Sequence, residues 1–240
     1  MRLKLLLAGL LILLPVPALA DVTAQYSAGP KDRLVIEADD GGNARASIGE
    51  KVAVIRRDGV DYVLVADATG DFRVARLGDV LALVAGQLKG KQGGDGAGLP
   101  ALTFEMRAGA EENVAGYGGT IWIFGPKPEA PGKEAGQQLE VVMSGDPALA
   151  PIGLFFRQLV EAGNPLIESM FGGGNFPTAS AELFAKGTPL RIGPMLKLES
   201  VSTAEIAASR FDLPGPVLEP IEFLEAITPS QSGGGLPPLP

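Results

Sequence analysis

The sequence has 240 residues, with 28 acidic residues against 20 basic ones, a formal net charge of −8, and neither His nor Cys. An acidic surface repels phosphate backbones, which argues against nucleic acid as a partner. Without His and Cys, Ser-His-Asp or Cys-His nucleophiles and zinc sites built on imidazole or thiolate are excluded. No disulfide can brace the fold, and an apolar fraction of 46% supports a hydrophobic core instead.

The first twenty residues have the three parts of a secretory signal peptide. Arg2 and Lys4 are basic, residues 5–14 are apolar, and Ala18 and Ala20 are the small residues that suit a signal-peptidase site. The apolar run is too short to cross a bilayer, which disfavours an uncleaved anchor. We therefore expect cleavage after Ala20, export to the periplasm, no transmembrane segment in the mature chain, and a single domain over residues 21–227.

Alternation of apolar and polar residues with a period of two predicts an antiparallel meander at the start of that domain. Asp58-Gly59 predicts a tight type I′ hairpin, because both central residues of that turn need positive φ. The strands of the meander are predicted over residues 22–27, 34–38, 43–48, 52–57, 60–67 and 72–77.

A helical period follows over residues 78–89, and the rest of the domain alternates between strands and helices. Asn164-Pro165 is interpreted as an N-cap and first-turn proline, which divides the helical region 148–171 into two helices. A turn is predicted at 111–113, and a bulge or a close backbone approach at Gly116, Gly118 and Gly119. The further strands are predicted over 99–107, 114–124, 139–144, 190–201 and 204–211, and a last helix over 219–227.

These elements define a mainly β (α+β) fold, a curved antiparallel sheet or half-barrel of about ten strands with a few helices covering its concave face. Gly-rich and Pro-rich segments at 90–98, 125–136 and 172–174 are predicted loops. The Gly/Pro-rich tail over residues 228–240 is predicted to be disordered.

Three short motifs, together with the signal peptide and the meander, carry a family resemblance. They are Glu112-Asn113-Val114-Ala115-Gly116-Tyr117, Thr188-Pro189-Leu190 and Phe211-Asp212-Leu213-Pro214. The chain resembles the uncharacterised exported bacterial proteins grouped near the LolA-like periplasmic lipoprotein-carrier superfamily. The resemblance implies a half-open sheet curled around an apolar cavity, helices as its lid, and a Gram-negative periplasm. The carrier proteins deliver acylated lipoproteins, so the resemblance implies only that the protein binds something apolar. We expect an apolar small molecule or an acylated protein as the partner.

Two groups of large apolar side chains are the candidate ligand site. One group lies on the predicted helical region 148–171, where a lid helix would present it to an acyl chain. The other lies on the Gly-rich strand 114–124, where it could frame a pocket mouth. Completion of the hydrophobic core is the alternative for both groups. The candidates are Tyr117, Trp122, Phe124, Phe155, Phe156, Leu159, Met170 and Phe171.

Acidic residues offer two weaker hypotheses. Calcium could be held by the turn residues Asp39, Asp40, Asp67 and Asp71, although their spacing is not that of a calcium loop and turns favour Asp anyway. A pair among Glu105, Glu111 and Glu112 could serve glycoside hydrolysis if the two carboxyls lay about 5–10 Å apart in a cleft.

These patterns favour a non-enzymatic binding or carrier-like protein without a metal or cofactor. The first alternative is a structural or assembly factor of the cell envelope that acts through protein contacts. The second alternative is a carboxylate-dependent hydrolase.

Overall fold

The computed structural model describes residues 21–91, 102–127, 138–171 and 174–228. The predicted signal peptide with its cleavage residues Ala18 and Ala20 lies outside the described residues. The same holds for the predicted tail after Thr228, for most of the predicted loops 90–98 and 125–136, and for residues 172–173.

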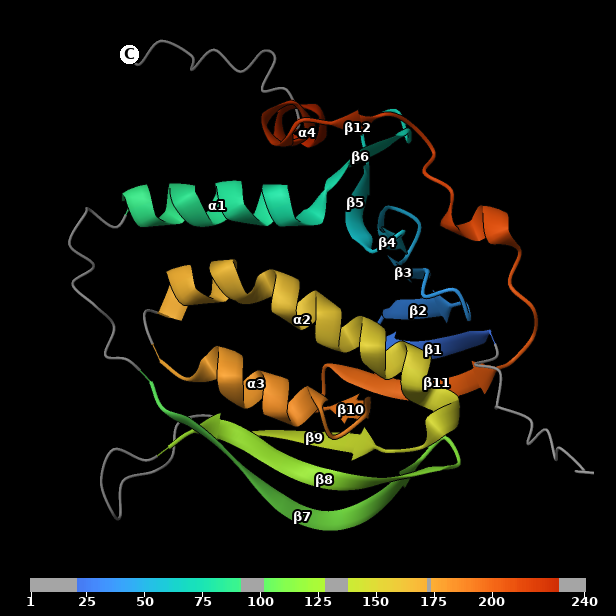
Figure 1. Ribbon diagram of the computed structural model, residues 1–240, viewed down its shortest axis with the longest axis vertical. Coiled ribbons are helices and arrows are strands. Elements are labelled where there is room, and N and C mark those ends of the chain that lie inside the picture. The colour runs from blue at the N-terminus through green and yellow to red at the C-terminus, as the bar shows by residue number, and fades with distance from the viewer. Residues whose placement is uncertain (1–20, 92–101, 128–137, 172–173, 229–240) are drawn as a thin grey trace, which may run out of the picture.

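One curved, unclosed sheet forms the body of the protein (Figure 1). It confirms the predicted mainly β fold, with twelve strands where about ten were expected. Its strands are β1 (Val22–Ala28), β2 (Asp32–Ala38), β3 (Ala44–Ile48), β4 (Val52–Arg57), β5 (Val60–Ala66), β6 (Phe72–Arg76), β7 (Phe104–Val114), β8 (Tyr117–Pro126), β9 (Leu139–Ser144), β10 (Thr188–Ile192), β11 (Leu196–Ser202) and β12 (Val217–Leu218).

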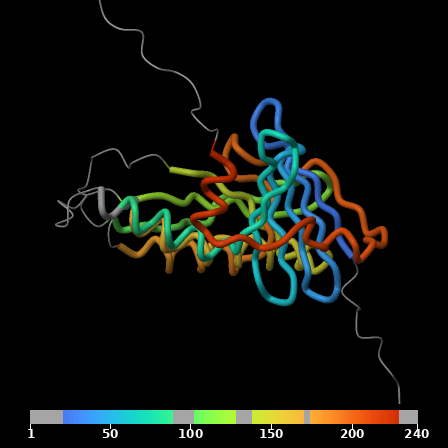
Figure 2. Tube along the Cα trace, turned by 90° about the horizontal axis from the view of Figure 1, so that it is seen from above, coloured from blue at the N-terminus to red at the C-terminus, as the bar shows by residue number. Residues whose placement is uncertain are grey.

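The strand order across the sheet is β12-β6-β5-β4-β3-β2-β1-β11-β10-β9-β8-β7. All neighbouring strands are antiparallel except β12 and β6, which form a short parallel pair at one edge. The predicted Asp58-Gly59 hairpin is confirmed, since these residues have φ of 51° and 77°. Figure 2 shows that the hairpin turns of the first strands project past the helices on both sides.

Helices fill the inside of the curve and cover one edge of the sheet (Figure 1). The second helix of the chain lies on β1, β2 and β10, and the first packs beside it and on β5 and β6. The described residues form four α-helices, α1 (Leu77–Lys91), α2 (Ala150–Phe171), α3 (Phe176–Phe184) and α4 (Pro220–Ile227), and two short 3-10 helices, η1 (Pro147–Leu149) and η2 (Ala208–Phe211).

The main hydrophobic core lies between α2 and the concave face of the sheet. Ile152, Phe155 and Phe156 of α2 are buried there against Tyr26 and Ile36. The rings of Tyr26 and Phe156 meet edge to face with centroids 5.7 Å apart, a favoured geometry for aromatic pairs. The apolar stripe of α2 therefore fills much of the space that the half-barrel encloses.

The predicted turn at residues 111–113 is wrong. These residues belong to β7, and the chain reverses at Ala115 and Gly116, whose φ values are 53° and 90°. Asn113 stabilises this reversal, because its Oδ1 accepts a hydrogen bond from the Gly116 N–H at 3.1 Å. The bulge lies in β7, between Ala108 and Glu111, rather than at the glycines of the neighbouring strand.

The close backbone approach predicted for this Gly-rich strand is confirmed at Gly119. A Cβ at this position would lie 2.9 Å from the Met143 carbonyl oxygen and from Val142 Cγ1. Only glycine allows β8 to come this near to β9.

The predicted helix start at Asn164-Pro165 is also wrong, because α2 runs through both residues as one helix of 22 residues. Contacts with α1, α3 and the sheet hold it together despite the backbone hydrogen bond that Pro165 cannot donate. The predicted strand over 204–211 is a loop that ends in η2. Phe211 is 3% exposed and packs on the outer face of the sheet against Ile55 and Leu64, which accounts for the apolar residue in this segment.

Candidate functional site

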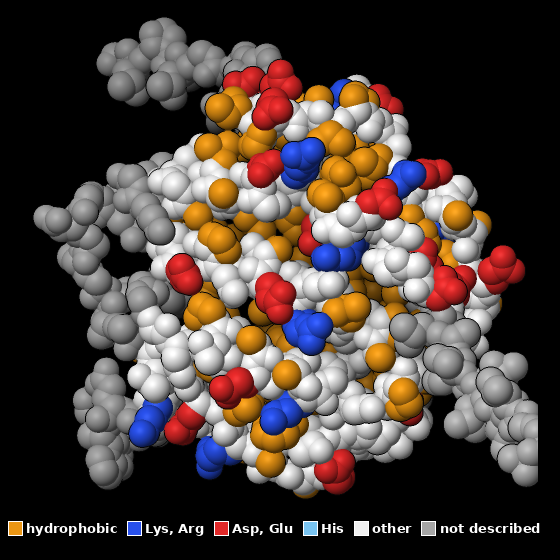
Figure 3. Space-filling view, in the orientation of Figure 1, with side chains coloured by type: hydrophobic (Ala, Val, Ile, Leu, Met, Phe, Trp, Pro, Cys, Tyr) orange, Lys and Arg blue, Asp and Glu red, His pale blue; other side chains and the backbone are white. Residues whose placement is uncertain are grey.

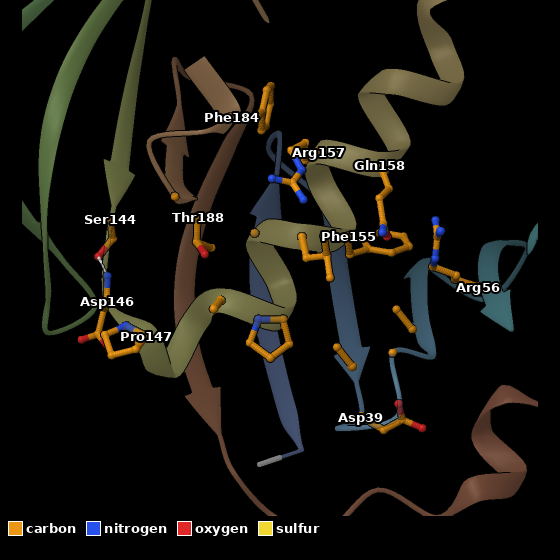
Figure 4. Close-up of a pocket in the computed structure, with 18 of the residues that line it drawn as sticks. Asp39, Arg56, Ser144, Asp146, Pro147, Phe155, Arg157, Gln158, Phe184 and Thr188 are labelled. Carbon is orange, nitrogen blue, oxygen red and sulfur yellow. Dashed lines mark hydrogen bonds between the residues drawn. The ribbon is translucent and has the colours of Figure 1, made fainter. Parts of the chain in front are cut away.

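A pocket of about 360 Å³ opens beside the first turns of α2. Its walls come from the β2–β3 turn with Arg56 of β4, from the chain that begins α2, and from the turn that leads into β10 (Figure 4). Ligand pockets commonly measure about 300–1,000 Å³. The volume therefore suits a small molecule or a short stretch of a longer chain.

The walls of the pocket are mainly apolar. The apolar side chains come from η1 and the first turns of α2, and from the end of α3: Pro147, Pro151, Leu154, Phe155 and Phe184. Leu154 is 39% exposed, although it lies next to buried neighbours on the same helix. An exposed leucine in a concave wall supplies apolar surface to a ligand.

The hydroxyl groups at the pocket are already used in the fold. Thr188 Oγ1 donates to the Leu149 carbonyl oxygen at 2.7 Å, and Ser144 Oγ donates to the Gly118 carbonyl oxygen at 2.7 Å. Ser144 Oγ also accepts a hydrogen bond from the backbone N–H of Asp146, drawn as a dashed line in Figure 4. These hydroxyls connect strand ends to neighbouring backbone and to the chain that leads into the helix.

Two charged groups of the pocket are likewise paired. The carboxylate of Asp39 accepts hydrogen bonds from the backbone and side-chain N–H groups of Asn43, both at 2.7 Å. Arg56 donates to both oxygens of Asp61 at 3.2 and 3.1 Å, and both side chains are less than 20% exposed. Burial raises the pKa of the Asp61 carboxyl above its ordinary value, an effect that the charge of Arg56 opposes.

Arg157 is a less constrained basic side chain of the pocket than Arg56, which is paired with Asp61. Its Nε lies 3.9 Å from Glu161 Oε1, beyond hydrogen-bond distance, and its side chain is 45% exposed. Figure 4 shows Arg157 on the side of α2 nearer Phe184, whereas Gln158 points toward Arg56. The guanidinium can therefore meet a polar group at the pocket mouth.

The structure distributes the predicted apolar site residues over separate places. Of the predicted residues whose side chains are described, Phe155 alone lines the pocket. Phe156 and Leu159 pack in the main core together with Tyr117. Trp122 and Phe124 belong to a second apolar cluster beneath α3, and Lys186 Nζ lies 5.0 Å from the centre of the Trp122 ring. Met170 and Phe171 lie in the last turn of α2, and their side chains are outside the described part of the structure.

Sequence reasoning missed Arg56, Leu154 and Arg157 as pocket residues. Leu154 and Arg157 lie off the apolar stripe of α2, so periodicity treats them as solvent-facing. Pro147 and Pro151 mark the start of the helix, but nothing local connects them to the β2–β3 turn. The pocket depends on the approach of two segments that are far apart in the sequence, one that includes Arg56 and one that begins at Ser144.

Asp39, Asp67 and Asp71, three of the four acidic turn residues that suggested calcium, accept hydrogen bonds from protein groups. Asp67 accepts hydrogen bonds from Thr69, from the Asp71 N–H and from Arg73. These contacts, first that with the Thr69 hydroxyl, hold the pKa of Asp67 well below its usual range. In the described residues, no group of three or more Asp and Glu side chains is arranged to hold a metal ion.

The acidic residues of β7 lie outside the pocket. Glu112 accepts hydrogen bonds from Arg191 at 3.1 and 2.7 Å, and this contact lowers its pKa. A general acid needs a raised pKa instead. Glu111 accepts a hydrogen bond from Thr120 Oγ1 at 2.7 Å.

The face in Figure 3 carries acidic and basic side chains in a dispersed pattern, and apolar side chains gather in its upper part, where β5 and β6 lie in Figure 1. Such a face has no large area of one charge for a charged polymer. Across the described residues, none of the helices is both long enough and apolar enough to cross a membrane.

Comparison with known proteins finds little. No protein-family model matches the chain, and no curated protein matches it. Among solved structures, the chain is similar to the crystal structure of MucB, with 13% sequence identity and a TM-score of 0.32. The match covers 81% of this chain and 57% of MucB, so the chain spans less than two thirds of that protein. The resemblance to LolA-like carriers remains a prediction.

Proposed function

We propose that the chain is an exported, non-enzymatic binding protein that holds an apolar chain, the acyl group of a lipid or of a lipidated partner. The observation that carries this proposal is the pocket at the start of α2. Its walls are apolar, and most of its polar atoms already have partners within the fold.

The pairing of the polar groups favours an acyl chain over a peptide. A peptide brings N–H and C=O groups that must find partners when they leave water. The hydroxyls of Ser144 and Thr188 and the carboxylate of Asp39 already have partners. An acyl chain has no such groups, and each CH₂ that it buries stabilises the complex by about 0.8 kcal/mol.

The polar end of the ligand would stay at the pocket mouth beside Arg157. Its side chain is half-exposed, and its Nε is 3.9 Å from Glu161 Oε1, too far for a hydrogen bond. The guanidinium can therefore bind an anionic or carbonyl head group. The hydroxyls of Ser144 and Thr188 are already hydrogen-bonded within the fold, and the sequence has neither His nor Cys. Both observations support a role without covalent chemistry.

A titration of residues 21–240 with a dansyl-labelled fatty acid tests this proposal. We expect saturable fluorescence enhancement, and at least tenfold weaker binding by Leu154→Asp, because that change places a charge in the apolar wall. Ile221→Asp is the matched control, since Ile221 is a 61% exposed helical residue of α4 that does not line the pocket.

Two results would contradict the proposal. One is the lack of saturable binding by the unmodified chain. The other is equal affinity of Leu154→Asp and Ile221→Asp for the fatty acid. Thermal unfolding of both variants establishes that each is folded under the titration conditions.

A further inference from the structure

Among the described residues, β7 is the edge strand at one end of the sheet and pairs with β8 alone (Figure 1). It has 11 residues, and those from Arg107 to Glu111 are exposed. The opposite edge is formed by β12, which has only two residues. A long edge strand presents backbone N–H and C=O groups on which another strand can pair.

Hydrogen bonds at the start of β7 fix which residues face outward. The Thr103 carbonyl oxygen accepts from the Lys127 N–H at 2.7 Å, toward β8. In an antiparallel ladder the direction of these groups alternates from residue to residue. Glu105 and Arg107 therefore face β8, and Met106 and Ala108 direct their N–H and C=O groups away from the sheet.

The outward-facing backbone groups at the start of β7 already form hydrogen bonds of the kind that a neighbouring strand makes, and their partner is Asn175. The Phe104 N–H donates to Asn175 Oδ1 at 2.6 Å, and Asn175 Nδ2 donates to the Phe104 carbonyl oxygen at 2.9 Å. The side-chain amide thus takes the place that a residue of a neighbouring strand would occupy. The outward groups of Met106 and Ala108 come next along the same edge, before the bulge at Ala108 and Glu111.

Pairing between two copies of β7 is disfavoured in the three antiparallel registers centred on Met106, Arg107 and Ala108. A two-fold axis at Arg107 would place that arginine opposite its own copy, and like charges directly opposite are destabilising. An axis at Met106 would pair Glu105 with Arg107 favourably, but it needs the backbone groups of Phe104 that Asn175 holds. An axis at Ala108 would run into the bulge.

We propose that β7 binds an extended segment of a different protein, which adds as an antiparallel strand opposite Met106 to Ala108. Met106 packs with the apolar cluster beneath α3, so the segment carries apolar residues on that face. Arg107 lies on the other face, where the residue opposite it is acidic. The bound segment therefore has the pattern apolar, acidic, apolar, and its affinity comes from backbone hydrogen bonds.

The test uses residues 21–240 labelled with ¹⁵N and a capped peptide, Thr-Val-Asp-Val-Thr. We expect saturable shifts of the Met106 and Ala108 amide signals and slower hydrogen exchange at both. The same peptide N-methylated at both valines should bind at least tenfold more weakly, because it cannot donate to the edge. A peptide with Lys in place of Asp should also bind more weakly, because it faces Arg107.

A matched pair of variants tests whether the peptide binds at the edge of β7 or elsewhere on the surface. Ala108→Pro removes the outward N–H and leaves the inward-facing groups of Arg107 in place, whereas Ala108→Ser keeps the N–H. We expect the peptide to lose binding only to Ala108→Pro.

The proposal is overturned if no signal of β7 responds to the peptide, or if the N-methylated peptide binds equally well. It is also overturned if the shifts map to the pocket at α2. The peptide comparison needs no substitution in the protein, so a folding defect of Ala108→Pro does not affect it.

Discussion

Tyr26 makes a buried hydrogen bond between the two halves of the chain, and its removal gives a measurable loss of stability. The side chain is fully buried, and its hydroxyl donates to the Pro189 carbonyl oxygen at 3.0 Å. Tyr26→Phe keeps the ring in contact with Phe156 but leaves that carbonyl without its donor. We expect a loss of about 1–2 kcal/mol of unfolding free energy at neutral pH.

The stability difference between the unmodified chain and Tyr26→Phe is expected to depend on pH, because Tyr26 can ionise and Phe cannot. Burial raises the pKa of Tyr26 above its ordinary value, which is about 10. The unfolded chain therefore ionises this group first as the pH rises. Its contribution to stability is complete below about pH 10 and decreases by about 1.4 kcal/mol per unit above it, until the folded pKa is reached. Phe at this position has no such decrease.

Urea unfolding of both forms at pH 7 and at pH 11 measures the effect. The unmodified chain should be the more stable at pH 7, and the difference should shrink or reverse at pH 11. Groups common to both forms cancel in the comparison. A difference that stays constant between the two pH values would refute the argument from burial.

Two further predictions concern contacts described above. In Gly153→Ala the new Cβ would lie 2.5 Å from Thr188 Oγ1, so α2 must move away from β10. We expect urea unfolding to show a loss of about 1–3 kcal/mol in the free energy of unfolding. An unchanged unfolding midpoint would contradict this close packing. The hydrogen bond from Arg191 lowers the pKa of Glu112 in the folded chain. The ion pair therefore contributes to folding stability above the ordinary pKa of about 4.3, and this contribution is lost as the pH falls through the lowered pKa of the folded chain. Glu112→Gln should lose roughly 1 kcal/mol at pH 7 and less below pH 4, as followed by acid-dependent unfolding, and a gap that widens in acid would count against the ion pair.

Local rules predicted the first half of the fold well. The meander depends on alternation and on turn residues such as Asp58-Gly59, and both signals lie within a few positions of the structure that they specify. The reversal at Ala115 was missed because alanine seldom adopts positive φ, so a turn at the preceding acidic residues had the stronger local signal. Pro165 was misread because packing along the whole of α2 outweighs its local preference.

The site was predicted only in part, and the reason is topological. Phe155 was identified because it belongs to a helical stripe, but that stripe contains core residues and pocket residues alike. Arg56 and Arg157 become neighbours of one pocket only when β4 and α2 come together in space. No pattern within a single segment of the sequence encodes such a meeting.

The pairing of β1 sets an order for how the chain can fold as it is synthesised. One side of β1 pairs with β2 immediately, but the other side pairs with β11, where Thr23 meets Ser202. Ribosomal synthesis proceeds from the N-terminus, so the first six strands can assemble early while this flank of β1 stays unpaired until nearly the whole chain has been made. A nascent half-sheet with an open flank is prone to join the wrong neighbour.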